Sequence, residues 1–294
     1  MNKVTVGPVG GVGIVHESEF ELRTEPWMVE HWVGSRAVEP PVVIRHRVGS
    51  ASVADAQLVY DGSPWSRYFV DSRGRQLVHF PEAGRQCPEQ ILVSVQPGYS
   101  YDLVYPDVPA APVMQSARDL PILTLALAAR GNAMLVHACG FLLSSGNGVL
   151  CPGLSGAGKS TLARLLERTT PAVEVLSDDR VVLSDRDGEL RLWGTPWPGD
   201  AFCAREGDGV LRSVVFLGRG KQRALRAVSP SDAARRLFSV VGMPFWDRGA
   251  LQHGLEIIDR VVGTIPLFEV SYEPTPSAAD WLMRALESEV EINV

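Results

Sequence analysis

Apolar and polar residues alternate in short segments through the first third of the chain. Segments such as VVIRHRV, RYFVDSRGRQLVHF and QILVSVQPGYSYDLVY are separated by turn-forming residues. This spacing predicts a small antiparallel β unit. A proline-rich segment at 106–113, PDVPAAPV, then interrupts the pattern. We therefore expect a domain boundary there, with a β-rich domain at 1–113 and a second domain at 114–294.

The pattern changes after this boundary. Residues 119–130, DLPILTLALAAR, are almost continuously apolar with a proline near the start, which predicts a buried helix. The apolar runs MLVHACGFLL and GVLCPG flank a Ser-Ser-Gly-Asn-Gly turn and predict a hairpin with positive φ at Asn147 and Gly148. Further strands are expected at 173–179, 212–220 and 265–272, and a hairpin is expected to turn at Asp187-Gly188. Helices are expected after 159, at 229–241, at 248–262 and at 278–289. Strands and helices thus succeed one another, and we expect an α/β domain.

Charge and size limit the class of protein. The chain has 294 residues, of which 45% are hydrophobic, enough for one large core or two modest ones. Its formal charge is −6, its pI is about 5.6, and its basic residues are scattered. A partner held mainly through nucleic-acid phosphates is therefore not expected.

The cysteines and the apolar runs point to a cytoplasmic location. Cys87, Cys139, Cys151 and Cys203 show neither metal-ligand spacing nor the density of a disulfide scaffold. The first residues are too rich in glycine for an export signal, and no apolar run reaches the roughly 18 residues that a membrane span needs. We expect reduced thiols, a cytoplasmic protein and no membrane partner.

The strongest motif is the segment GLSGAGKS at 153–160, which matches G-x-x-x-x-G-K-S between a predicted strand and a predicted helix. Glycines let the backbone curl so that several N–H groups point at one phosphate, and the helix adds the positive end of its dipole. Lys159 is expected to reach the β and γ phosphates, and Ser160 to ligate Mg²⁺. A glycine-rich turn that ends in Lys-Ser by chance is the alternative, and the flanking elements speak against it. The residues expected to bind ATP are Gly153, Leu154, Ser155, Gly156, Ala157, Gly158, Lys159, Ser160 and Thr161.

Asp178 and Asp179 close a short apolar strand soon after this loop. Neighbouring side chains of a strand point to opposite faces, so the two carboxylates are expected to have different tasks. A kinase needs one group to hold Mg²⁺ and another to orient and deprotonate the attacking hydroxyl, and this pair could supply both. The alternative is a solvated Asp-Asp turn that Arg180 neutralises.

The run from LVHACGF through GVLCPGLSGAGKSTLARLL to VLSDDRVVL and GTPWPGD resembles the catalytic domain of HPr kinase/phosphorylase, a member of the phosphoenolpyruvate-carboxykinase-like superfamily. It is most similar to the compact stand-alone serine-kinase-like members, over roughly residues 119–272. The resemblance implies a P-loop kinase core of that superfamily with a smaller β-rich N-terminal domain, and self-association. It also implies that His137 lies near the reacting phosphate, that Asp178 and Asp179 act as base and metal-linked acid, and that Asp200 supplies a second acid to the metal.

Each implied role has a plainer alternative. His137 could be a satisfied core histidine, Asp200 could belong to a proline-rich turn, and Arg219, which could stabilise transferring phosphate, could be a surface arginine. The chain also departs from the family, with Leu154 where the family has an acidic residue, and without the long downstream loop of the phosphorylase reaction. The resemblance therefore does not extend to reverse phosphorolysis.

The function expected from the sequence is an ATP-dependent kinase. It would transfer the γ-phosphate of Mg-ATP to a hydroxyl, with Asp178 as the preferred base and His137, Asp179 and Lys159 as its catalytic partners. The acceptor expected from the resemblance is a serine of a peptide or protein, including a ribosomally made precursor peptide. A small-molecule kinase and a non-catalytic ATP-binding regulatory module are the alternatives.

Overall fold

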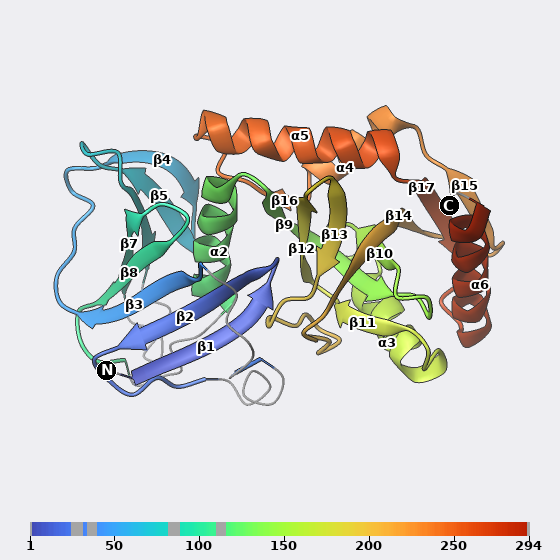
Figure 1. Cartoon of the computed structure of the whole chain (residues 1–294), viewed down its shortest axis with the longest axis horizontal. Coiled ribbons are helices and arrows are strands. Elements are labelled where there is room, and N and C mark those ends of the chain that lie inside the picture. Colours follow the sequence, from blue (N-terminus) through green and yellow to red (C-terminus); the bar gives the residue numbers. More distant parts are fainter. Residues whose placement is uncertain (1, 25–31, 34–39, 82–88, 110–115, 293–294) are drawn as a thin grey trace. The chain divides into compact units, whose positions relative to one another are not determined.

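A computed structural model describes residues 2–24, 32–33, 40–81, 89–109 and 116–292. The described residues form two β-sheets and five helices (Figure 1). The chain divides into two compact units, Met1–Arg130 with Pro244–Leu251, and Gly131–Met243 with Gln252–Val294. This division groups the first helix with the β-rich part of the chain, whereas the sequence places the boundary at 113/114. The proline-rich segment behind that expectation lies partly outside the described residues.

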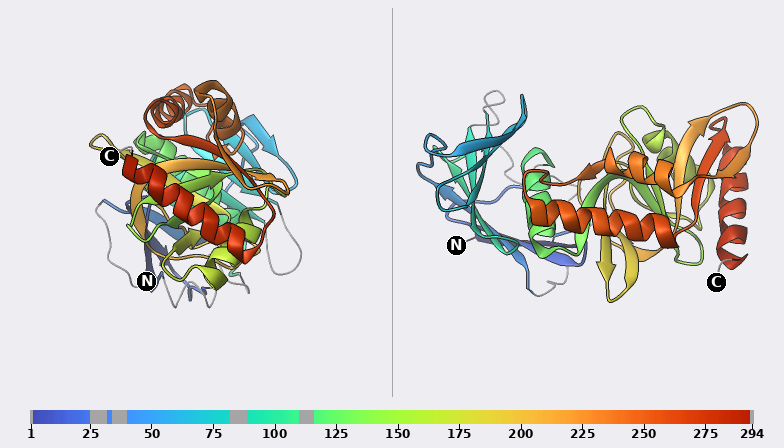
Figure 2. Two further views of the ribbon diagram at one scale, coloured as in Figure 1. Left: turned by 90° about the vertical axis from the view of Figure 1, so that its right-hand side faces the viewer. Right: turned by 90° about the horizontal axis from the view of Figure 1, so that it is seen from above.

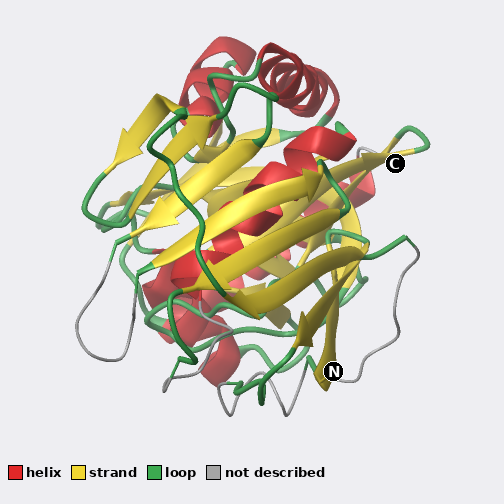
Figure 3. Cartoon of the chain, turned by 90° about the vertical axis from the view of Figure 1, so that its left-hand side faces the viewer, coloured by secondary structure: helices red, strands yellow, loops and turns green. Residues whose placement is uncertain are grey.

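The N-terminal unit is built on an eight-stranded sheet in the order β1-β2-β3-β8-β7-β6-β5-β4. Its strands lie side by side across the view of Figure 3. The β2–β3 and β3–β8 pairs are parallel and the others antiparallel, so the sheet is mixed rather than purely antiparallel as the alternating pattern predicts. The elements of this unit are β1 (Asn2–Val9), β2 (Val12–Ser18), β3 (Val42–Val48), β4 (Gln57–Gly62), β5 (Ser66–Val70), β6 (Gln76–Phe80), β7 (Gln90–Gln96), β8 (Ser100–Tyr105) and α2 (Ser116–Arg130).

A buried polar chain crosses three neighbouring strands of this sheet. Nδ1 of His16 lies 2.9 Å from Nε2 of His46, and Nδ1 of His46 lies 2.8 Å from the hydroxyl of Tyr105. Burial lowers the pKa of His46 to about 4, and burial together with His46 lowers the pKa of His16 well below 6.5. Both imidazoles are therefore neutral at neutral pH, so each can donate one hydrogen bond and accept another.

The second unit holds a nine-stranded sheet in the order β10-β9-β12-β13-β14-β17-β15, with β11 and β16 also paired to β9. A further pairing of β10 with β14 closes β10, β9, β12, β13 and β14 into a ring of strands. Helix α5 (Arg248–Thr264) begins in the first unit and belongs to the second from Gln252 onward. The other elements of the second unit are β9 (Ala133–Leu142), β10 (Gly148–Pro152), α3 (Lys159–Thr169), β11 (Glu174–Ser177), β12 (Arg180–Arg186), β13 (Glu189–Trp193), β14 (Asp208–Arg219), β15 (Ala224–Ala227), α4 (Pro230–Phe238), β16 (Val241–Gly242), β17 (Leu267–Tyr272) and α6 (Pro276–Ile292).

Local signals account for most of these elements. The β12–β13 hairpin turns at Asp187 and Gly188, which have φ of 49° and 87°, as the sequence predicts. Ser229 caps α4 by accepting a hydrogen bond from the Asp232 N–H at 3.3 Å, also as predicted. The β9–β10 hairpin is present, but its left-handed residue is Gly146, with φ of 80°. The expectation of positive φ at Asn147 and Gly148 was wrong. The turn is closed by two backbone hydrogen bonds, from the Leu143 N–H to the Asn147 carbonyl and from the Gly146 N–H to the Leu143 carbonyl, so Gly146 takes the left-handed position.

Helix α3 carries the apolar face that anchors the glycine-rich loop at 153–160. Leu162, Ala163 and Leu166 are fully buried at helical spacing, in a core formed with β9, β10 and α6. Helices α3 and α6 lie side by side (Figures 1 and 2). The start of α3 is thereby held rigidly against the end of β10.

Three of the cysteines, Cys139, Cys151 and Cys203, are buried free thiols, and Cys87 lies outside the described residues. Among the described residues, no helix combines the length and the apolar character needed to cross a bilayer.

Candidate functional site

The segment between β10 and α3 has the conformation that its glycines predict. Gly156 and Gly158 have φ of 82° and 103°, values that residues with a Cβ rarely adopt. A Cβ on Gly153 would lie 2.7 Å from the Cβ of Ala157. All three glycines are therefore required for the loop to curl as tightly as it does.

The first turn of α3 offers unpaired backbone donors to this loop. Its N-cap is Gly158, which has no side chain to accept a hydrogen bond from the helix. The first N–H groups of a helix have no partner within the helix, and together with the dipole they make an anion site. An uncapped helix start beneath a curled loop therefore fits a phosphate group.

Lys159 lies folded against the loop itself. Its ammonium donates hydrogen bonds to the carbonyls of Gly153 at 2.7 Å and Leu154 at 3.1 Å. Burial lowers the pKa of Lys159, and the nearby Asp179 acts in the opposite direction. The ammonium is thus held at the mouth of the anion site by neutral acceptors that a phosphate could replace.

Strand β9 brings the loop and the paired acids together. The carbonyl of His137 accepts a hydrogen bond from the Gly153 N–H at 3.2 Å, and the next N–H, of Ala138, donates to the carbonyl of Asp179 at 3.1 Å. Strand β10 pairs with one edge of β9, and β11 and β12 lie end to end along its other edge. The glycine-rich loop and the acids therefore flank the same two residues of β9.

Asp179 faces His137 at the junction of β11 and β12. Nε2 of His137 lies 3.0 Å from Oδ1 of Asp179, and Nε of Arg180 lies 3.5 Å from its Oδ2. Burial by itself raises the pKa of Asp179, but the His137 hydrogen bond and the charges of Arg180, His137 and Lys159 outweigh burial, so the pKa lies below its usual value. The carboxylate is ionised at neutral pH.

Asp178 points the other way, into the protein. Its side chain is 0% exposed, and its carboxylate accepts hydrogen bonds from the backbone N–H groups of Gly199, Ala201 and Cys203 at 2.9, 2.8 and 3.2 Å. It does not line the cavity described below. The two acids do point to opposite sides, as expected, but the side that reaches the cavity belongs to Asp179, whereas the sequence favours Asp178 as base.

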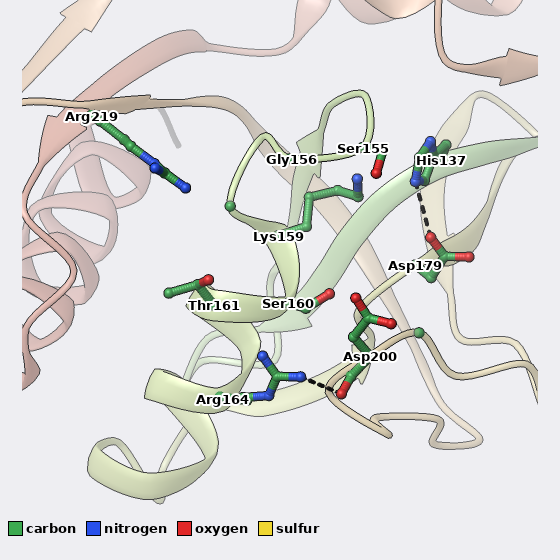
Figure 4. A pocket seen from close by; sticks show the side chains of 12 residues that line it. His137, Ser155, Gly156, Lys159, Ser160, Thr161, Arg164, Asp179, Asp200 and Arg219 are labelled. Carbon is green, nitrogen blue, oxygen red and sulfur yellow. Dashed lines mark hydrogen bonds and ion pairs between the residues drawn. The ribbon is translucent and has the colours of Figure 1, made fainter.

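A cavity of about 360 Å³ lies over the start of α3 (Figure 4). Most of the residues singled out from the sequence line it, including Lys159, Ser160, Asp179 and Asp200. Gly153, Leu154 and Ala157 do not line it, and the Leu154 side chain is 60% exposed. The lining residues are His137, Ser155, Gly156, Gly158, Lys159, Ser160, Thr161, Arg164, Asp179, Gly199, Asp200 and Arg219.

The side chains in this cavity separate into two ends. Figure 4 shows His137, Asp179 and Asp200 on one side of the phosphate loop and Arg219 on the other, with the Ser160 hydroxyl directed toward Asp200. The acids and the histidine thus form one end. Arg219, at the end of β14, forms the other.

The acids present suit Mg²⁺ bound with a nucleotide. In the described part of the chain, no three His, Cys, Asp or Glu side chains are grouped closely enough to hold a metal by themselves. Mg²⁺ usually binds through one or two carboxylates together with substrate phosphates and water. Ser160 and Asp200, with Asp179 nearby, match that donor set.

Arg164 and Gly199 also line the cavity, although neither was among the site residues expected from the sequence. Arg164 follows Ser160 by four residues and so shares its helix face, a signal that was present in the spacing. Its guanidinium donates to the backbone carbonyl of Asp200. Gly199 belongs to the segment GTPWPGD, which the resemblance includes, but its own place in the cavity depends on how this segment packs against Asp178 and Asp179.

A second, smaller recess adjoins the cavity. It shares Gly158, Thr161 and Arg219 with the cavity and is otherwise bordered mainly by apolar groups. The remaining residues that border it are Ala157, Leu217, Gly218, Tyr272 and Pro274.

No protein-family model matches the chain, and no curated protein matches it. Among solved structures, the chain is similar to the Hpr(Ser) kinase/phosphatase from Coxiella burnetii, with 11% sequence identity and a TM-score of 0.30. That match covers 53% of this chain and 89% of the other. A likeness of this size assigns no activity to the chain.

Proposed function

We propose that the second unit is an ATP-dependent kinase that transfers the γ-phosphate of Mg-ATP to a hydroxyl group. The observation that carries the proposal is one cavity that combines an uncapped helix start, Lys159, Ser160 and the His137–Asp179 pair. Phosphoryl transfer needs a phosphate cradle, charge neutralisation and an oriented acceptor more than it needs covalent chemistry. The cavity has a candidate for each.

The loop amides and Lys159 would bind the β and γ phosphates. Lys159 would exchange its two carbonyl partners for phosphate oxygens, which form stronger hydrogen bonds with an ammonium because they are charged. Ser160 and Asp200 would hold Mg²⁺, which supplies neutralisation of the charge on the transferring phosphate. Arg164 would keep the Asp200 segment against α3.

Asp179 is the base in this proposal. As the acceptor oxygen bonds to the γ-phosphorus, the bond from that phosphorus to the ADP oxygen breaks, and Asp179 takes the hydroxyl proton. A carboxylate with a low pKa can serve, because the hydroxyl becomes acidic only as transfer proceeds. His137 holds the carboxylate at 3.0 Å and fixes its direction. This reverses the assignment favoured by the sequence, in which Asp178 was the base.

The nucleoside would leave the phosphate loop on the Arg219 side. The acids occupy the opposite end of the cavity, and the apolar recess formed with Leu217, Tyr272 and Pro274 lies next to Thr161 and Arg219. The nucleobase of ATP could lie against that recess while Arg219 contacts the sugar or the α-phosphate. Arg219 would then bind the nucleotide rather than stabilise the γ-phosphoryl group during its transfer.

The acceptor we propose is a serine of a peptide or protein, such as a ribosomally made precursor peptide, as the resemblance of the sequence motifs implies. A small-molecule hydroxyl is the alternative within the same chemistry. A cytoplasmic location and self-association remain predictions from the sequence.

The test combines binding and turnover. Calorimetry measures the affinity for Mg-ATP, and γ-labelled ATP measures transfer to serine peptides and to water. Asp179→Asn is expected to lower turnover about 10²- to 10⁴-fold, the usual contribution of a positioned base, while the Mg-ATP affinity changes less than tenfold. Asp259→Asn, on the exposed face of α5, is the matched control.

Two results would overturn the proposal. If Asp179→Asn turns over like the wild type, Asp179 is not the base. If Mg-ATP binds but neither water nor any peptide or small hydroxyl compound accepts phosphate, the chain is a nucleotide-binding regulatory module instead.

A further inference from the structure

The segment from Gly199 to Cys203 wraps around one buried carboxylate. Asp178, wholly buried, accepts the N–H groups of Gly199, Ala201 and Cys203, every second residue of the segment. Among the described residues, no Lys, Arg or His side chain forms an ion pair with Asp178. A buried charge is costly unless it is hydrogen-bonded, so these three N–H groups carry most of its stabilisation.

The wrapped segment adopts a conformation that it would not adopt alone. A Cβ on Gly199 would lie 2.7 Å from Oδ2 of Asp178 and 2.8 Å from the Cβ of Asp179, so the backbone approaches both acids closely. Phe202 has φ of 57° although it has a Cβ, and its side chain is 80% exposed. Left-handed backbone and an exposed phenyl group both cost free energy, and such strain persists only where the surroundings impose it.

The centre of this segment reaches the cavity. Asp200 lies between two of the residues that donate to Asp178, and its carboxylate lines the cavity beside Ser160 (Figure 4). On the other side, the Asp200 carbonyl accepts a hydrogen bond from Arg164 of α3. The position of Asp200 is thus set by one buried carboxylate and one helix.

We propose that Asp178 is a positioning residue: its carboxylate holds residues 199–203 so that Asp200 is presented to the magnesium ion of bound Mg-ATP. The inference rests on the proposed function, because it needs a metal in the cavity. A base at Asp178 would have to abandon its three N–H partners to reach the acceptor. A positioning role uses those same bonds.

The experiment that tests this role measures the Mg²⁺ requirement of ATP binding rather than the rate of turnover. Asp178→Asn keeps the size of the side chain but replaces one acceptor oxygen by a donor, which cannot serve the facing N–H group. The Mg²⁺ concentration that half-saturates ATP binding is expected to rise about 10- to 100-fold, as is usual when a group that orients a metal ligand is lost. ATP affinity in EDTA should change less than twofold, and Asp259→Asn should change neither quantity.

A double-mutant cycle shows whether the two acids act as one. Asp200→Asn should raise the Mg²⁺ requirement at least as much as Asp178→Asn, and the double variant should raise it no further than Asp200→Asn alone. Independent, additive effects would overturn the inference. So would an Asp178→Asn variant with a normal Mg²⁺ requirement and no phosphate transfer, since that result would make Asp178 the base.

Hydrogen exchange tests the loop without any substitution. The amides of Ala201 and Cys203 are expected to exchange slowly in the wild-type protein, because both are bonded to a buried acceptor. Fast exchange there would overturn the inference even if Asp178→Asn failed to fold. A wild type that binds no Mg-ATP but protects these amides would instead remove the proposed function and leave the loop anchor standing.

Discussion

Replacing Lys159 by methionine separates the two tasks of this side chain. Methionine keeps most of the apolar stem and removes the ammonium. Lys159 is 5% exposed, and its ammonium donates to the carbonyls of Gly153 and Leu154. The substitution therefore removes two hydrogen bonds in the free protein and the charge that would meet the phosphates in the bound one.

The size of each loss follows from these contacts. Hydrogen bonds to charged groups contribute about 1.5–3 kcal/mol each, but relief from burying the ammonium offsets part of this, so we expect a net loss of about 1–2 kcal/mol. For a unit of this size, that loss lowers Tm by about 2–8 °C. In the complex, one lost contact with a charged phosphate corresponds to roughly 10- to 150-fold weaker binding.

Thermal melting of the free protein and calorimetric titration with Mg-ATP measure the two effects separately. Lys221→Met, at an exposed lysine of the same unit, is the control and should alter neither quantity. Wild-type affinity for Mg-ATP in Lys159→Met would refute the phosphate site. An unchanged Tm would refute the contribution of the two carbonyl contacts.

Two further predictions concern stability. Burial lowers the pKa values of His16 and His46 below 6.5 in the folded protein, so the unfolded chain binds more protons than the folded one between pH 6.5 and about 4. The free energy of unfolding should therefore fall as pH falls through this window, by about 3 kcal/mol for His46 alone. Urea unfolding across that range should show the slope, and His46→Gln should reduce it while the contribution of the buried His16 remains. Gly194→Ala should lower Tm, because the added Cβ would lie 2.0 Å from the Arg205 carbonyl oxygen. Gly263→Ala should raise Tm slightly, because it lies in α5 with open space around it and alanine is the better helix former. Equal shifts of Tm in the two variants would contradict this reasoning.

Local patterns were enough to predict the elements that carry the site. The apolar run before 153, the three glycines and the helical spacing after Lys159 predict a strand, a curled loop and a helix, and the structure has all three. The positive φ values at Gly156 and Gly158 follow from the missing Cβ. Such features depend on residues close in the sequence, which is why they can be read from it.

The alternation rule also predicted that Asp178 and Asp179 would point apart, but not which of them would reach the cavity. That choice depends on which side the segment from Gly199 to Cys203 packs, more than twenty residues along the chain. Likewise, β9 joins Gly153 to Asp179 through hydrogen bonds to strands that are distant in the sequence. The division of the chain near Arg130 also depends on contacts between distant segments.

The sequence by itself thus determined which groups are available, a glycine-rich loop with a lysine, a hydroxyl and a pair of acids close behind it. Only the tertiary structure decided which of these side chains reach the cavity, because their burial and their partners come from strands and loops far away in the sequence. Asp178 and Asp179 are chemically identical neighbours, yet one is bonded to three backbone N–H groups and the other faces His137 in the cavity.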